Sequence, residues 1–265
     1  PAVDLVDRVR GALWGVFIAD ALSMPVHWYY DVGALYRDFP GGISRYEAPK
    51  QKHPSSIMSL SSTGGHGRGG QRGRIIGDVI NHGKHRFWGK SGMHYHQGMS
   101  AGENTLNALV GRVVVRGMSE EGGYSAGRFL NDYVGFMTTP GSHNDTYAES
   151  FHRDFFSNYA RGVPPAACAG EEGHNTPSIG GFVMLPPVVL GTMRRGWERC
   201  REATLQHLYL THKSPALGTA AEIYAKALMD VAGGRDLRET VREAAGAVGA
   251  GVDGVAKRGA TDRPV

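Results

Sequence analysis

The feature that most constrains this chain is the spacing of its apolar side chains, which in several segments recur every three or four residues. Such spacing places apolar residues on one face of a helix. The first segment spans 4–22, and Pro25 predicts its end near Met24, because the residue before a proline disfavours the helical conformation. The pattern therefore predicts a helix at the start of the chain.

The same periodicity predicts further helices at 104–116, 125–138, 145–160, 181–193, 197–211, 216–232 and 237–248. Almost no segment alternates with the two-residue period of a half-buried strand, so strands are not predicted. No fixed-period repeat indicates a solenoid. We expect an all-α fold in which residues 1–265 form a single multi-helix domain.

One long stretch interrupts this pattern. Residues 39–102 are rich in Gly, Pro and Ser, with glycines concentrated between Gly64 and Gly102, and only a short helix is expected at 75–81. We expect an irregular insertion here, and its His, Arg, Asn and aromatic residues favour a functional loop over a disordered one. Residues 249–265 are expected to form a flexible basic tail.

Charge and hydropathy exclude several classes of function. The chain has 29 basic and 25 acidic residues spread along its length, so its formal charge of +4 does not predict nucleic-acid binding. No stretch approaches the roughly 20 apolar residues of a membrane span, and no signal-peptide pattern opens the chain. We therefore expect no membrane span.

Cysteine content bears on the compartment. Cys168 and Cys200 are the only cysteines, too few for a disulfide framework and without metal-binding spacing. An intracellular, reducing compartment is expected, most simply the cytoplasm. Because the numbered chain begins with Pro, an organelle transit peptide stays an open alternative.

Two groups of polar residues lie at predicted helix ends. Asp20 falls in the last turn of the first helix, where the helix dipole disfavours a negative charge, so it needs a partner or belongs to a site. Glu103, Asn104 and Thr105 open the helix at 104–116, and their oxygen atoms suit Mg²⁺ or Ca²⁺. Taken alone, Asn and Thr at such a position favour helix capping.

The densest polar segment is 140–153. Asp145, Glu149 and His152 are spaced by four and three residues, which predicts one shared helical face. Such a face is either a surface ladder of ion pairs or one wall of a polar pocket. The neighbouring His143, Asn144 and aromatic residues favour the pocket.

A polar turn at 174–181 precedes an apolar run. Gly180 and Gly181 would let the backbone approach a ligand closely, although a tight turn before a buried helix explains them equally well. The sequence carries no Gly-x-Ser-x-Gly elbow, no phosphate-binding Gly-x-x-x-x-Gly-Lys loop and no His-Glu-x-x-His zinc helix. Those chemistries are excluded.

Five segments in this order resemble the ADP-ribosylglycohydrolase superfamily, and specifically its branch that includes the jellyfish J-type lens crystallins. Residues 10–25 resemble the family's first helix, and 27–31 are similar to the crystallin branch. Residues 103–105 fall where the family carries a metal-binding Asp-Asp-Thr, 178–181 where it has a Gly-rich segment bordering the ADP-ribose pocket, and 211–216 resemble its Thr-His loop.

The resemblance implies an orthogonal all-α domain that holds an ADP-ribose-like small molecule with two Mg²⁺ ions and hydrolyses the bond at its anomeric carbon. It implies that Glu103, Asn104 and Thr105 contribute to the magnesium site. Glu149 and Asp145 would be catalytic, with Glu149 a candidate general base. The implied substrate-binding residues are His143, Asn144, His152, Ser178, Gly180 and Gly181.

Two departures from the family pattern predict a diverged metal site. Asn104 stands where the family has Asp, and no counterpart of the second metal motif follows Thr211. Two functions therefore stay open. One is a hydrolase or binder of an ADP-ribosyl or related glycosidic substrate. The other is a catalytically inactive relative, a pseudoenzyme serving as a crystallin-like structural subunit with protein assembly partners. Convergence of Asp20, Glu103, Asp145 and Glu149 in one cleft would favour the first.

Overall fold

The computed structural model describes residues 4–60, 75–171 and 178–248. Three predictions lie outside these residues: the glycine-rich run within 61–74, the turn residues 174–177 and the basic tail at 249–265. Statements about structure below concern the described residues.

The described chain is helical. Its α-helices are α1 Leu5–Ser23, α2 Val32–Asp38, α3 Leu106–Glu121, α4 Ala126–Thr138, α5 Ser150–Ala160, α6 Leu185–Thr192, α7 Trp197–Tyr209, α8 Pro215–Gly233 and α9 Leu237–Ala247. Short 3₁₀ or π segments occupy Met24–Val26, Met58–Leu60, Ile75–Ile80, Lys84–Phe87, Pro165–Ala167, Ile179–Met184 and Met193–Arg195. Two isolated bridges, Lys52 with Met93 and Gly170 with His212, are the extended pairings found between described residues. The predicted all-α fold is confirmed.

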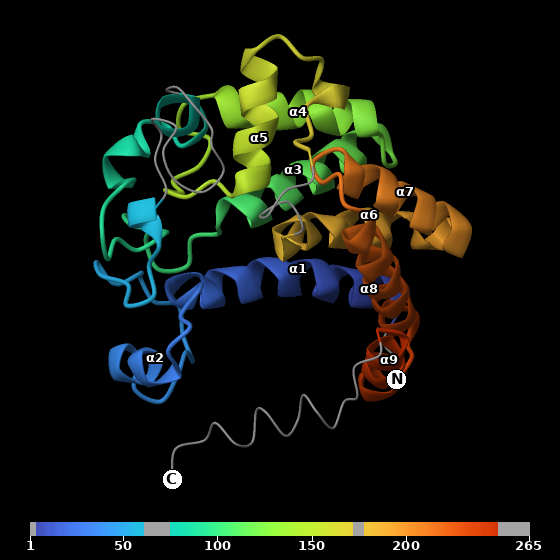
Figure 1. Ribbon diagram of the computed structural model, residues 1–265. Helices are drawn as coiled ribbons and strands as arrows, with labels where there is room; N and C mark the ends of the chain where they lie inside the picture. Colours follow the sequence, from blue (N-terminus) through green and yellow to red (C-terminus); the bar gives the residue numbers. More distant parts are fainter. Residues whose placement is uncertain (1–3, 61–74, 172–177, 249–265) are drawn as a thin grey trace.

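Layers of crossing helices make up the molecule. Figure 1 shows α1 along one side, α3 and α6 above it, and α4 and α5 beyond α3, with α7 and α8 at one end. Helix α6 packs against α3, α7 and α8, while α1 contacts α3, α6 and α8. The helix ends that meet above the C-terminal half of α1 create the site described below.

Local sequence explains most helix boundaries. Helix α1 ends at Ser23, as Pro25 predicts, and a 3₁₀ turn follows. The side chains of Ser125, Ser214 and Asp236 each accept a backbone N–H three residues further on and so cap α4, α8 and α9. These caps satisfy backbone donors that the helices themselves leave unpaired.

The predicted helix at 145–160 is wrong in its first turn, since α5 begins only at Ser150. Asp145 and Glu149 precede the helix and do not share a helical face with His152. The cause is local, because the carboxylate of Asp145 accepts the backbone N–H of Tyr147 and competes with helix formation.

Two other elements differ from prediction. Helix α2 was not predicted, because its seven residues are too short for a periodic signal, although Asp31 caps it by accepting from the N–H of Ala34. The helix predicted at 181–193 begins as a 3₁₀ segment, Ile179–Met184, and becomes α-helical at Leu185. Prolines in the first turn of α6 leave no N–H to extend the helix backwards.

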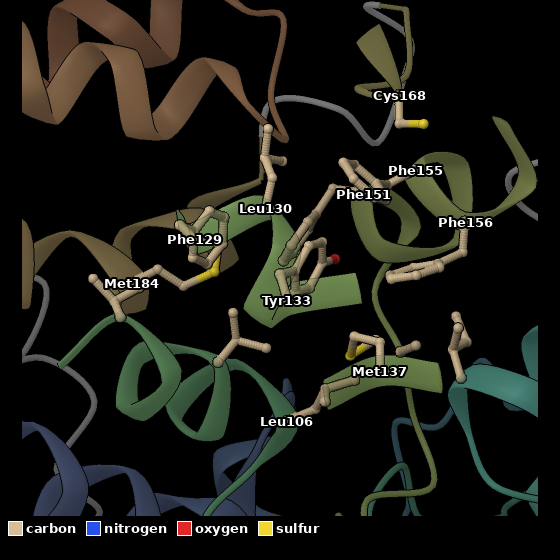
Figure 2. Close-up of a cluster of buried hydrophobic side chains, with 14 of the residues drawn as sticks. Leu106, Phe129, Leu130, Tyr133, Met137, Phe151, Phe155, Phe156, Cys168 and Met184 are labelled. Carbon is tan, nitrogen blue, oxygen red and sulfur yellow. The ribbon is translucent and has the colours of Figure 1, made fainter. Parts of the chain in front are cut away.

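The largest apolar cluster lies between α3, α4 and α5 (Figure 2). Tyr133 of α4 stacks on Phe129 with ring centroids 5.4 Å apart and meets Phe155 edge-on at 5.0 Å. Burying each such ring contributes about 1.5–3 kcal/mol to stability. This core fixes α5 and the segment before it against α3.

A smaller cluster lies within the described part of 39–102, which consists of short helical turns and irregular backbone. Met58, Ile76, Trp88 and Tyr95 pack together and are each at most 6% exposed. This satellite core holds the backbone beside Tyr95 in place, and the next residue, His96, enters the site.

One segment, Leu5–Val26, is long and apolar enough to cross a membrane, judged by length and composition alone. Core helices and N-terminal signal sequences pass the same test. In this chain the segment contacts α3, α6 and α8, and the carboxylate of Asp20 at its end bonds to the start of α3. The described residues therefore hold no strong candidate for a membrane span.

Candidate functional site

A cavity of about 610 Å³ lies where the C-terminal end of α1 meets the N-terminal end of α3, the segment before α5 and the 3₁₀ turn before α6. Three of the four acids whose convergence would favour a hydrolase border it: Asp20, Asp145 and Glu149. The cavity is also bordered by the predicted residues Thr105, Ser178 and Gly180. The structure therefore brings most of the predicted acidic residues together.

Asp20 connects α1 to α3. Its carboxylate accepts hydrogen bonds from the Thr105 hydroxyl at 2.6 Å, the Thr105 N–H at 2.8 Å and the Asn104 side-chain amide at 3.0 Å. Burial raises the pKa of Asp20, although these hydrogen bonds oppose the shift. The partner that this carboxylate needs is thus the N-terminus of α3, where unpaired donors favour negative charge.

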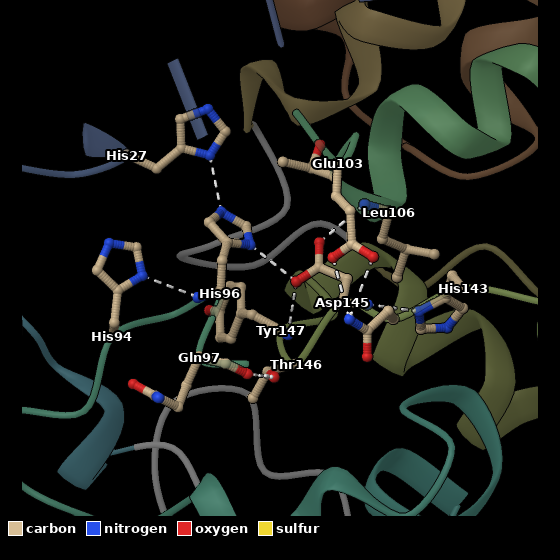
Figure 3. Close-up of polar contacts among 12 residues, drawn as sticks. His27, His94, His96, Gln97, Glu103, Leu106, His143, Asp145, Thr146 and Tyr147 are labelled. Carbon is tan, nitrogen blue, oxygen red and sulfur yellow. Dashed lines mark hydrogen bonds and ion pairs between the residues drawn. The ribbon is translucent and has the colours of Figure 1, made fainter. Parts of the chain in front are cut away.

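Asp145 is 1% exposed and fully engaged. One oxygen accepts from His96 Nδ1 at 2.7 Å and from the Tyr147 N–H at 3.1 Å, and the other accepts from the Leu106 N–H at 2.8 Å (Figure 3). Burial alone would raise the pKa of Asp145, but His96 and the backbone donors lower it to about 2. The carboxylate is therefore ionised and occupied by protein donors.

Glu149 has a different environment. Its carboxylate accepts from the Asn107 amide at 2.5 Å and from the Ser178 hydroxyl at 3.1 Å, both of them neutral groups. Burial raises the pKa of Glu149, and these hydrogen bonds offset the shift only in part. The protonated form is thus favoured more than in a free side chain, as a general acid requires.

His152 does not border the cavity but acts on Glu149 through Asn107. Its Nε2 donates to the Asn107 side-chain oxygen at 2.9 Å, and its Nδ1 accepts from the Tyr133 hydroxyl at 2.5 Å. Burial lowers the pKa of His152 well below its usual range, so the ring is neutral. This chain of three bonds fixes the Asn107 amide so that its NH₂ faces the Glu149 carboxylate.

Gly180 and Gly181 are explained by protein side chains. A methyl group on Gly180 would lie 2.6 Å from the carboxyl carbon of Glu149, and one on Gly181 would lie 2.6 Å from the His212 ring. Gly180 borders the cavity while Gly181 faces His212 behind it. The sequence predicted that the backbone of this turn approaches a ligand closely. In the structure, the groups that it approaches are the side chains of Glu149 and His212.

The predicted residues His143 and Asn144 do not border the cavity. His143 is buried and donates through Nε2 to the carbonyl of Ile80 at 2.6 Å. The exposed Asn144 donates to Glu103 at 3.0 Å and accepts from Lys84 at 2.6 Å. Both residues brace the segment that carries Asp145.

The predicted magnesium ligands all contact protein groups, and Thr105 alone of the three borders the cavity. Glu103 accepts from the Ser100 N–H at 2.8 Å and from Asn144, outside the cavity. The Asn104 amide nitrogen and the Thr105 hydroxyl both donate to Asp20. No group of three or more His, Cys, Asp or Glu side chains among the described residues is arranged to hold a metal. Mg²⁺ binding by Glu103, Asn104 and Thr105 stays a prediction.

Sequence reasoning missed Asn107, which binds the Glu149 carboxylate, and a second group centred on His96. His96 joins Asp145 to His27, whose Nδ1 lies 2.8 Å from His96 Nε2, and His27 Nε2 lies 3.2 Å from the Ser23 hydroxyl. Burial and the neighbouring His96 lower the pKa of His27 to about 3. The repeated histidines at positions 94 and 96 were the signal that could have drawn attention to this stretch.

The fold and the site together define an all-α protein with an acid-bordered ligand cavity at converging helix ends. The family model for ADP-ribosylglycohydrolases matches residues 1–262, and the chain belongs to this family. No curated protein matched the chain. The superfamily prediction is confirmed, whereas the crystallin branch stays a prediction.

Proposed function

We propose that the chain binds an ADP-ribosyl or related glycosidic substrate in this cavity and hydrolyses its glycosidic bond. The observation that carries the proposal is the convergence of Asp20, Asp145 and Glu149 on one cavity. A volume of about 610 Å³ falls within the range of about 300–1,000 Å³ for small-molecule sites. Glycoside hydrolysis uses carboxyl groups in different protonation states, and the surroundings shift the pKa of Glu149 upward and that of Asp145 downward.

The three acids take different roles. Glu149 is the acid–base group, because it borders the cavity, its pKa is raised by burial, and its two partners leave it able to exchange a proton. Asp20 and Asp145 organise the site, since both carboxylates bind backbone donors at the start of α3. Mg²⁺ stays a prediction, and none of these roles depends on it.

A second candidate is a catalytically inactive relative that serves as a structural subunit. It is favoured by Glu103 and Asn104, two of the three predicted magnesium ligands, which contact protein groups and do not border the cavity. Protein assembly partners and a reducing, intracellular compartment both stay predictions.

Titration calorimetry with ADP-ribose tests the first proposal, with and without millimolar Mg²⁺. We expect saturable binding, and we expect Glu149→Gln to lower hydrolysis of an ADP-ribosylated protein by about 10²- to 10⁴-fold. The exposed Glu239→Gln on α9 is the matched control and should leave both properties unchanged. Asn104→Asp shows whether a restored acid adds metal-dependent binding. No binding in any condition, by a folded chain, would favour the structural subunit.

A further inference from the structure

Four side chains form a continuous hydrogen-bonded row along one wall of the cavity. Asp145 contacts His96 at 2.7 Å, His96 contacts His27 at 2.8 Å, and His27 contacts the Ser23 hydroxyl at 3.2 Å. Figure 3 shows His96 between His27 and the Asp145 carboxylate, with a dashed contact to each. All four residues border the cavity, although they come from three distant parts of the sequence.

The Ser23 hydroxyl has one proton and two acceptors in reach, the Asp20 carbonyl oxygen and His27 Nε2, each at 3.2 Å. If it donates to the carbonyl, His27 must carry its proton on Nε2 and accept at Nδ1 from His96. His96 then has protons on both nitrogens, because its Nδ1 also donates to Asp145. The row is then positively charged at His96.

The second arrangement is equally complete. If Ser23 donates to His27 Nε2, then His27 carries its proton on Nδ1 and donates it to His96 Nε2. His96 is now neutral and still donates through Nδ1 to Asp145. The two arrangements differ by one proton and by the direction of each bond between Ser23 and His96, and neither requires the rings to move.

We propose that His27 and His96 form a proton relay that takes a proton from the cavity and stores it beside Asp145. The relay serves the reaction proposed above and rests on that function. The relay lets a proton from the cavity reach His96 beside Asp145. The Asp145 oxygens themselves are occupied by protein donors.

The transfer conserves atoms and charge. The O–H bond of a cavity water breaks and its electron pair stays on the oxygen. The water proton passes to Ser23 Oγ while the Ser23 hydroxyl proton forms an N–H bond at His27 Nε2. The His27 Nδ1–H bond breaks and a bond forms at His96 Nε2, which becomes an imidazolium paired with Asp145. The hydroxide oxygen attacks the anomeric carbon, and Glu149 gives its proton to the departing group. After release of the products, His96 returns the stored proton to solvent and Glu149 takes a proton back from solvent.

The charge rests on His96 because of its surroundings. His27 holds a proton poorly, since its pKa is lowered to about 3 by burial and by His96. His96 instead contacts an ionised carboxylate directly and lies nearly parallel to the Trp28 ring at 5.8 Å, a face that attracts cations. The titratable groups that act on the two rings are Asp20, Asp145, Glu149, His53 and His94.

The neighbouring histidines cannot change tautomer in this way. His53 donates through Nε2 to the carbonyl of His27 and accepts at Nδ1 from the Ser55 N–H. His94 donates through Nε2 to the carbonyl of Pro25 and accepts at Nδ1 from the His96 N–H. Both are held neutral in one tautomer, because a backbone carbonyl only accepts and a backbone N–H only donates.

Imidazole ¹⁵N NMR on the ligand-free chain tests the relay between pH 5 and 9, with each ring assigned through its Cβ to the backbone. We expect His96 to lose one proton in a single transition. At the same pH, His27 should stay neutral but move its proton from Nε2 to Nδ1. The rings of His53 and His94 are internal controls and should keep the proton on Nε2 throughout.

Three outcomes would overturn the relay: a His27 ring that keeps one tautomer, a His27 ring that becomes doubly protonated, or a His96 ring that does not titrate. Ser23→Ala removes the hydroxyl at His27 Nε2 but keeps the bond between His27 Nδ1 and His96 Nε2, so the His27 tautomer change should still coincide with the His96 transition. Because no ligand is present, the result is independent of ADP-ribose binding. A tautomer switch without any hydrolysis would leave the relay standing and contradict the proposed function.

Discussion

Gly180 is the residue whose size most directly limits the site, because the Glu149 carboxylate lies where its side chain would be. We expect Gly180→Ala to cost about 1–3 kcal/mol of unfolding free energy, as overpacking does, and to weaken ADP-ribose binding by displacing Glu149. Urea unfolding and calorimetry measure the two effects.

Gly135→Ala on the exposed side of α4 is the matched control for Gly180→Ala, since a methyl group there meets nothing within 4 Å. It should stabilise the chain by about 0.5–1 kcal/mol, because alanine loses less conformational freedom in a helix. If the two substitutions had equal effects on unfolding free energy and on ADP-ribose binding, the small size of Gly180 would not be required for the site.

Residue chemistry in the sequence identified part of the site. Asp145 and Glu149 stood out as closely spaced acids within the densest polar segment, and both border the cavity. The prediction assumed that both acids share a helical face with His152. That assumption is wrong, because α5 begins only at Ser150, and His152 contacts Asn107 instead of bordering the cavity. His96 could not be assigned, because its partners Asp145 and His27 lie 49 and 69 residues away along the chain.

Helix α3 begins at the centre of the site and is capped from outside its own sequence. Thr105 is its N-cap residue but makes no side-chain cap, and the carboxylates of Asp20 and Asp145 accept the N–H groups of Thr105 and Leu106. The sequence favoured capping by Asn or Thr, and capping does occur here, but through two acids from other segments.

The pH dependence of stability tests this cap through Asp145→Asn. The folded pKa of about 2 lies below the unfolded 3.8, so the ionised carboxylate contributes stability above pH 3.8 that is lost as pH falls through 2. At pH 7 the variant should lose on the order of 2 kcal/mol.

Urea unfolding of the wild type and Asp145→Asn at pH 7 and pH 2 measures the difference, which should shrink at the lower pH. The exposed Asp7→Asn, whose Arg10 partner lies at the surface, is the control and should change stability by under about 1 kcal/mol. A pH-independent loss for Asp145→Asn would assign its role to side-chain shape instead of charge.

The helix bounds were predicted correctly where the apolar pattern was long. They were predicted incorrectly where polar contacts to the backbone determine where a helix begins. Helices α1, α4, α7, α8 and α9 follow the predicted spans to within two residues. The start of α5 was displaced because Asp145 bonds to backbone N–H groups instead of letting the helix begin there. The apolar period alone cannot predict this, since one competing N–H comes from Tyr147 in the same segment and the other from Leu106 of α3.

At the scale of the whole molecule, the site exists only when distant segments meet. Ser23, His96, Glu149 and Ser178 border one cavity, yet each comes from a different part of the chain. The sequence predicted Glu149 and Ser178 as site residues but not Ser23 or His96, and it could not predict which side chains pair. The pairing depends on the packing of α3 against α1, α4 and α6, which no local pattern encodes.

The two cysteines test whether the helices form one cooperative unit, as the single-domain prediction requires. Cys168 belongs to the core shared by α3, α4 and α5, while Cys200 packs between α6, α7 and α8, and both are fully buried. Burial also raises the pKa of the Cys168 thiol, which lowers its reactivity. We expect neither thiol to react with a maleimide in the native chain.

In increasing urea, both thiols should become reactive over the same concentration range, because α6 packs on α3 as well as on α7 and α8 and so couples the two cores. Mass spectrometry of the labelled peptides reports each cysteine separately and needs no variant. Reaction of Cys200 at a urea concentration that leaves Cys168 protected would mean that α6–α8 unfold as a separate unit. Phe182 and Pro186, next to and within α6, line the cavity. The cavity would then open before the core that carries the acids unfolds.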